Sequence, residues 1–151
     1  MENSSMTDEH YMKIALMEAE TALERGEVPI GAVIVSNNRV IGRGHNLVET
    51  LHDVTAHAEM QAITAASDTL GGKYLNECTL YVTIEPCAMC AAAIGWAQMG
   101  RLVYGAADEK RGFRKMYGDE RGPLHPKTQI TSGVLANECA TLITGFFRKL
   151  R

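Results

Sequence analysis

Four residues in two short stretches have the types and spacing of a metal-dependent hydrolytic site. His57 and Glu59 lie in Thr-Ala-His-Ala-Glu, and Cys87 and Cys90 follow in Pro-Cys-Ala-Met-Cys. Catalytic zinc sites typically have three protein ligands and leave the fourth tetrahedral position to water. Zinc lowers the pKa of bound water from about 15.7 to about 7. We therefore expect one zinc ion per chain, held by His57, Cys87 and Cys90.

Glu59 supplies the proton carrier that such a site requires. It follows His57 by two residues on a predicted helix, so it is displaced around the helix and need not touch the metal. A Cys-x-x-Cys pair alone also suits a redox dithiol or a four-ligand structural zinc site. Both are alternatives, although a redox dithiol does not require a His-x-Glu motif elsewhere.

Hydrophobic periodicity predicts the helices and strands that position these residues. Helices are expected after an N-cap at Thr7, from Thr55 to about residue 66, from Cys87 to about residue 98, and after an N-cap at Asn137. Strands are expected at residues 30–35, 39–44, 78–84, 101–105 and 128–131, with a long loop over 112–126. This order predicts an α/β fold with a mixed, mostly parallel sheet covered by helices on both faces.

The composition is that of an ordinary globular protein. The 151 residues are 46% hydrophobic and 22% charged, which predicts a single domain over residues 1–151 with a substantial core. The polar start, Met1 to Thr7, does not resemble a signal peptide, and no apolar run approaches the roughly 20 residues of a membrane span. We expect a cytoplasmic protein with no membrane partner.

The distribution of charge leaves two interpretations open. A net charge of −3 argues against general nucleic-acid binding, but basic residues gather late in the chain, Arg114 and Lys115 among them. They form either a solvated loop and a basic helix end or a local phosphate-binding patch.

The combination of His-Ala-Glu with Pro-Cys-x-x-Cys is the signature of zinc-dependent nucleobase deaminases. The chain resembles the cytidine deaminase-like superfamily and, more closely, the bacterial tRNA-specific adenosine deaminases. The resemblance covers nearly the whole length and is carried by residues 27–33, 44–46, 53–59, 80–87 and 133–139. It implies a three-layer α/β/α fold around a mixed five-stranded sheet, and hydrolysis of adenosine to inosine at the wobble position of a tRNA anticodon loop.

The resemblance also implies roles for individual residues. His57, Cys87 and Cys90 hold zinc, and Glu59 moves protons. The resemblance also implies a homodimer, in which each chain helps to complete the pocket of its neighbour. The implied substrate contacts are Val28, Asn46, Ala58 and Asp108, and the implied RNA contacts near the C-terminus include Phe147 and Arg148. Asn46 could instead be a turn residue, Asp108 a helix cap, and Phe147 part of the core.

Two other functions remain open from the sequence. A deaminase of free guanine, cytosine or a nucleoside would use the same metal and Glu59. A tryptophan soon after the second Cys, here Trp96, resembles members of the superfamily that act on free guanine. The segment over residues 112–117 also departs from many tRNA deaminases. A noncatalytic zinc-binding module is the third possibility, against which the presence of Glu59 argues.

Overall fold

The computed structural model describes residues 6–150, so most of the polar N-terminal segment lies outside the described residues. None of the helices within 6–150 has the length and apolar character needed to cross a bilayer. The described chain forms, in order, α1 (Asp8–Glu24), β1 (Gly31–Ser36), β2 (Arg39–His45), α2 (Val48–Leu51), α3 (Ala58–Leu70), β3 (Thr79–Ile84), α4 (Ala88–Trp96), β4 (Arg101–Ala106), α5 (Phe113–Tyr117), β5 (Gln129–Ser132) and α6 (Ala136–Lys149).

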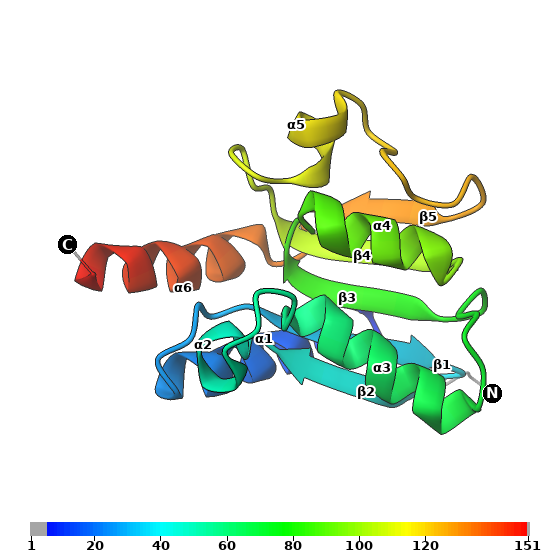
Figure 1. Cartoon of the computed structure of the whole chain (residues 1–151), viewed down its shortest axis with the longest axis horizontal. Helices are drawn as coiled ribbons and strands as arrows, with labels where there is room; N and C mark the ends of the chain where they lie inside the picture. The colour runs from blue at the N-terminus through cyan, green and yellow to red at the C-terminus, as the bar shows by residue number, and fades with distance from the viewer. Residues whose placement is uncertain (1–5, 151) are drawn as a thin grey trace.

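One five-stranded sheet in the order β2-β1-β3-β4-β5 organises the described chain (Figure 1). β1 is antiparallel to both β2 and β3, whereas β4 is parallel to both β3 and β5. The mixed sheet is confirmed. β2, β3, β4 and β5 run in one direction, as expected for a mostly parallel sheet, but the reversed β1 makes two of the four strand pairings antiparallel. The hairpin between β1 and β2 reverses the chain, and α3 then returns it past β1 to β3, so β1 opposes both of its neighbours.

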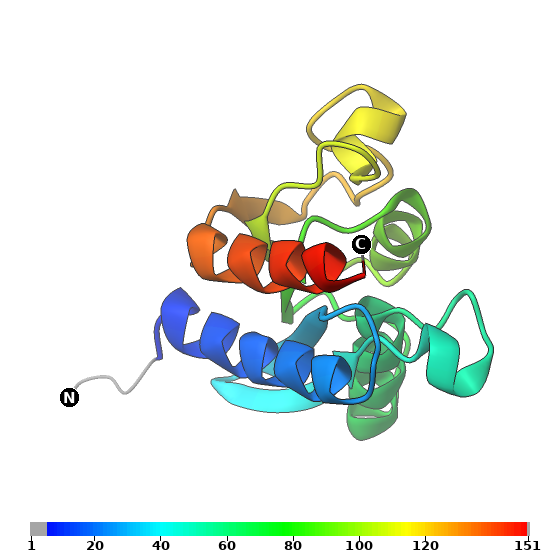
Figure 2. The same cartoon turned by 90° about the vertical axis from the view of Figure 1, so that its left-hand side faces the viewer.

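Helices cover both faces of the sheet, which confirms the three-layer α/β/α architecture. α3 and α4 lie on one face and α1 and α6 on the other (Figures 1 and 2). A core cluster joins α3, α4 and the sheet through Ala62, Leu80, Ile94 and Leu102. A second cluster joins α1 and α6 to the opposite face. Gly31 permits a close approach of α1, because a Cβ there would collide with the backbone oxygen of Ala15.

Three local expectations are corrected by the structure. α3 begins after His57, not Thr55, because the Thr55 N–H and hydroxyl donate to Asp53 Oδ1 at 2.8 and 2.7 Å. Asn137 lies inside α6, whose N-cap position is occupied by Leu135 in the left-handed region. The segment 112–126 is not entirely loop, since α5 forms there around the fully buried Phe113. The Thr7 N-cap is confirmed, accepting the His10 N–H at 3.1 Å.

Candidate active site

The N-terminal ends of α3 and α4 bring the three predicted ligands together. His57 and Cys87 occupy the N-cap positions of these helices in extended conformations, and Cys90 lies in the first turn of α4. The exposed N–H groups and dipole at a helix start favour negative charge, which stabilises thiolates there. Two helix starts therefore converge on one candidate cation site.

The spacing of the ligand atoms fits a tetrahedral zinc ion. His57 Nδ1 lies 3.6 Å from Cys87 Sγ and 3.5 Å from Cys90 Sγ. Bonds of about 2.3 Å to sulfur and 2.0–2.1 Å to nitrogen at tetrahedral angles would hold these atoms about 3.5–3.6 Å apart. In the part of the chain that the structure describes, no fourth His, Cys, Asp or Glu joins this group. The donor set therefore leaves one coordination position for water or substrate.

The electrostatics of the group also suit a cation. The hydrogen bond from Cys90, with help from His57, lowers the pKa of Cys87 to about 4. The same contact with Cys87, together with burial, raises the pKa of Cys90. Contact with Cys87 raises the pKa of His57. Without metal the two thiols share a single negative charge, and a bound cation would favour ionisation of the second.

Glu59 lies beside the ligand group without belonging to it. Its side chain is buried, at 3% exposure, in the first turn of α3. Burial raises the pKa of Glu59 to about 7, and its carboxyl group contacts the Cys90 thiol. A carboxyl group with such a pKa exchanges protons readily at neutral pH, as a general acid and base must. This arrangement is the one that the prediction for Glu59 requires.

A hollow of about 250 Å³ opens beside His57 and contains three of the four predicted substrate contacts. Val28, Asn46 and Ala58 all line it. Asn46 Oδ1 accepts the Val48 N–H at 3.2 Å, so its interpretation as a turn residue describes part of its role. The same side chain nevertheless faces the hollow.

Glu27 shapes this hollow and was missed by sequence reasoning. It is buried, and its carboxylate accepts the N–H groups of Glu49 and Thr50 at 3.1 and 2.6 Å and the Thr50 hydroxyl at 2.6 Å. Burial acts to raise its pKa, but these hydrogen bonds lower the pKa of Glu27 overall. Glu27 thus fixes α2 along the rim. Its signals in the sequence are an acidic residue beside a buried strand and a place at the start of residues 27–33, which carry part of the family resemblance.

The fourth predicted substrate contact, Asp108, lies in a separate groove of about 750 Å³ with two predicted RNA contacts. Phe147 and Arg148 from α6 line this groove together with Lys110 and Arg111. Phe147 is 46% exposed and therefore does not belong to the core. Asp108 Oδ1 accepts the N–H groups of Lys110 and Arg111 at 3.1 and 3.0 Å, so Asp108 also caps its own turn.

Arg114 and Lys115 do not line this groove. The Arg114 guanidinium donates to the buried carboxylate of Glu85 at 3.0 Å and lies 5.7 Å from the centre of the Tyr104 ring. Lys115 is exposed. Arg114 therefore has a structural role, and its replacement would disturb Glu85 as well as any contact with RNA.

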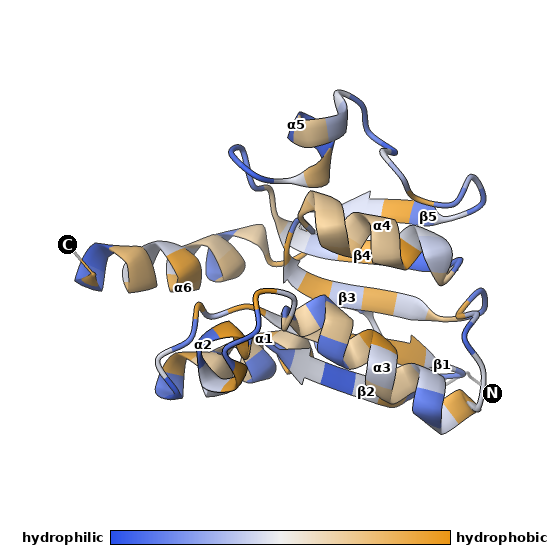
Figure 3. Ribbon diagram, in the orientation of Figure 1, coloured by the Kyte–Doolittle hydropathy of each residue, from blue (hydrophilic) through white to orange (hydrophobic). Residues whose placement is uncertain are grey.

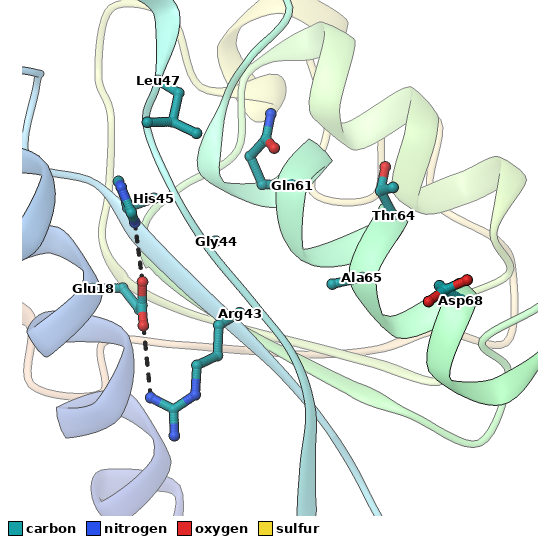
Figure 4. Close-up of a pocket in the computed structure, with 9 residues that line it drawn as sticks. All are labelled: Glu18, Arg43, Gly44, His45, Leu47, Gln61, Thr64, Ala65 and Asp68. Carbon is teal, nitrogen blue, oxygen red and sulfur yellow. Dashed lines mark hydrogen bonds and ion pairs between the residues drawn. The ribbon is translucent and has the colours of Figure 1, made fainter. Parts of the chain in front are cut away.

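Another hollow, of about 510 Å³, lies between α1, β2 and α3 and does not include the metal ligands (Figure 4). Glu18 lines it from α1, with Oε1 3.1 Å from His45 Nδ1 and Oε2 3.6 Å from Arg43 Nη1. Neither the predicted ligands nor Glu59 line this hollow. His57 lines the hollow of about 250 Å³, so we assign the candidate active site to that one.

Residues 6–151 match the family model of the MafB19-like deaminases. The chain belongs to this deaminase family. The tRNA-specific adenosine deaminase of Bacillus subtilis (strain 168) is 46% identical over 148 residues, covering 95% of this chain and 91% of that protein. A solved structure from studies of A-to-I editing by tRNA:A34 deaminases superposes with a TM-score of 0.81 at 45% identity, covering 88% of this chain and 98% of that one.

These similarities confirm the predicted resemblance to tRNA-specific adenosine deaminases. The structure of guanine deaminase from Bacillus subtilis is also similar, at 41% identity and a TM-score of 0.65, but covers 68% of this chain and 66% of that one. A deaminase is therefore established, and the free-base alternative is the less favoured of the two.

Proposed function

We propose that this deaminase is a zinc-dependent enzyme that hydrolyses adenosine to inosine at the wobble position of a tRNA anticodon loop. The observation that carries the proposal is its similarity to a tRNA-specific adenosine deaminase over 95% of the chain. The grouping of His57, Cys87 and Cys90 supports a zinc cofactor. A tRNA substrate also implies a cytoplasmic location.

The reaction adds water to adenosine and releases ammonia, with inosine as the other product. His57, Cys87 and Cys90 would hold zinc, which when bound supplies the Lewis acidity that activates water at neutral pH. Glu59 accepts a proton from the water and delivers it to the departing amine nitrogen. Asn46, Val28 and Ala58 line the hollow beside His57 and would hold a base turned out of its stack there.

The deciding experiment offers the zinc-loaded protein an anticodon stem-loop with a wobble adenosine, and separately offers free guanine, cytosine and adenosine. We expect inosine in the stem-loop together with release of ammonia, and little ammonia from the free compounds. Turnover of a free base with an untouched stem-loop would overturn the tRNA assignment.

The groove beside α6 would contact the RNA backbone, with Phe147 available to stack on a base. Replacing Arg148 with alanine removes one positive charge from this groove. We expect weaker stem-loop binding and a slope of log affinity against log salt that is reduced by about 0.7. Binding measured at several salt concentrations tests this.

Lys73→Ala is the matched control for Arg148→Ala. Lys73 lies beyond the C-terminal end of α3, whereas His57 precedes its N-terminal end, and the helix between them has 13 residues. At 1.5 Å per residue these ends are about 20 Å apart. An equal loss of salt dependence in both variants would contradict a local RNA contact.

A homodimer formed through α4 is also part of the proposal. Figure 3 shows α4 largely in hydrophobic colours, and Trp96 is 83% exposed at its end. Met89, Ala92 and Ala93 on the same helix are partly exposed as well. Because Cys87 and Cys90 also belong to this region, a second copy packed on α4 would lie beside the metal site and could complete its pocket.

Replacing Trp96 with glutamate is expected to weaken this dimer about 30-fold or more, because buried tryptophans dominate many interfaces. Sedimentation over a range of protein concentrations would measure the change. Met17→Glu is the control, since Met17 is 59% exposed on α1, which covers the other face of the sheet. A Trp96→Glu protein that associates as the original does would exclude α4 as the interface.

A further inference from the structure

A single buried carboxylate connects the segment that carries two metal ligands to the loop over residues 108–114. Glu85 follows β3 directly, precedes Cys87 by two residues and is 2% exposed. Its Oε1 accepts the backbone N–H of Asp108 at 3.1 Å, and its Oε2 accepts the backbone N–H of Arg114 at 3.0 Å. The Arg114 guanidinium also donates to Oε1, at 3.0 Å. Both ends of the loop are thus bonded to one side chain.

Gly112, within the loop, packs directly against the same carboxylate. A Cβ added to Gly112 would collide with Glu85 Oε2, so only glycine permits this approach. Gly112 also pairs with Cys87 in an isolated antiparallel bridge, and the Phe113 N–H donates to the Pro86 oxygen at 2.9 Å. The loop is therefore fitted directly onto the backbone of the metal-binding segment.

The other side of this loop faces the groove beside α6. Asp108, Lys110 and Arg111 line that groove. Glu85 neither belongs to the ligand group nor carries protons in the proposed reaction. A buried carboxylate costs free energy unless its hydrogen bonds compensate, so its partners indicate its role. Within residues 6–150, each hydrogen bond that its carboxylate accepts comes from the loop that presents these groove residues.

We propose that Glu85 is a positioning residue that holds loop 108–114 where Lys110 and Arg111 contact RNA phosphates next to the metal site. The RNA contact rests on the proposed function, whereas the hold on the loop is a property of the free protein. Loss of the Glu85 charge loosens the loop and weakens productive RNA binding. The metal ligands and Glu59 retain their places, because none of them bonds to Glu85.

The first test measures amide hydrogen exchange by NMR in the zinc-loaded Glu85→Gln protein. The amides of Asp108 and Arg114 are expected to exchange about tenfold faster, because each loses a charge-assisted hydrogen bond. Amides of α3 and α4 are expected to keep their original rates. Unchanged exchange rates in the loop would overturn the proposal. An equal increase in α3 and α4 would also overturn it, because it would show that Glu85 stabilises the whole fold and not the loop in particular.

The second test uses deamination of the anticodon stem-loop by the same protein. KM is expected to rise about tenfold while kcat changes by less than about twofold, since binding is lost and chemistry is kept. Lys110→Ala should raise KM in the original protein and have a much smaller effect in Glu85→Gln. A full Lys110→Ala effect in both backgrounds would contradict positioning by Glu85.

Gly112→Ala is a second variant that leaves the charge of Glu85 intact. Its new methyl group must push the loop and the Glu85 carboxylate apart, so faster loop exchange and a raised KM are again expected. Gly72→Ala is the matched control, because a Cβ on Gly72 meets nothing within 4 Å. If the original protein leaves the stem-loop untouched, the tRNA function and the RNA contact both fail, and the exchange rates still decide whether Glu85 holds the loop.

Discussion

Replacing Glu59 with glutamine is expected to lower kcat for deamination by about 10²- to 10⁴-fold, the usual contribution of a general acid or base. The amide has nearly the shape of the carboxyl group, so the buried site keeps its packing. It cannot accept a proton from water and return it to the leaving nitrogen. Rapid-quench measurement of inosine, together with metal analysis, would show lost chemistry with retained zinc.

The control for Glu59→Gln is Asp68→Asn, which removes a carboxylate from the exposed far end of the same helix. Its kcat should match that of the original protein. A Glu59→Gln enzyme with ordinary turnover would remove Glu59 from the mechanism.

The raised pKa of Glu59 also predicts how the metal-free protein responds to pH. Its value of about 7 in the folded protein exceeds the ordinary 4.5, so the folded state binds more protons between these limits. Stability should therefore fall as pH rises from about 4.5 to about 7, and this contribution should be absent from Glu59→Gln. Denaturant unfolding of both metal-free proteins across this range measures the difference.

Removing the metal is expected to reduce deamination to background, and adding zinc should restore it. Cys87→Ser and Cys90→Ser should each lose stoichiometric zinc, because a serine hydroxyl does not ionise readily and is a poorer zinc ligand than a thiolate. Metal content per chain and the rate of inosine formation, measured on the same samples, are the two required readings.

Cys78→Ala is the matched control, since Cys78 is a free cysteine, buried like Cys90, but is absent from the ligand group. It should retain one zinc ion per chain and ordinary turnover. Full activity in a protein shown to be free of metal would refute the zinc-dependent mechanism, whatever the arrangement of the ligands.

Sequence reasoning succeeded where the signal is local. The strands expected at residues 30–35 and 39–44 follow from neighbouring residues, and Asn37 and Asn38, both with positive φ, form the turn between them. Its errors lie where two local interactions compete. Thr55 is a suitable N-cap by type, but Asp53 engages its N–H and hydroxyl two residues earlier and delays the helix to Ala58.

By itself the sequence determined which residues could form a metal site, because the spacing of His57, Glu59, Cys87 and Cys90 on helix starts restricts what those side chains can do together. Only the tertiary structure decided which residues surround that chemistry. Arg114 has a basic side chain suited to RNA, yet it pairs with Glu85, 29 residues away. Phe147 has the character of a core residue, yet it lines an open groove. Contacts between distant segments set these roles, and residue type and local periodicity carry little information about them.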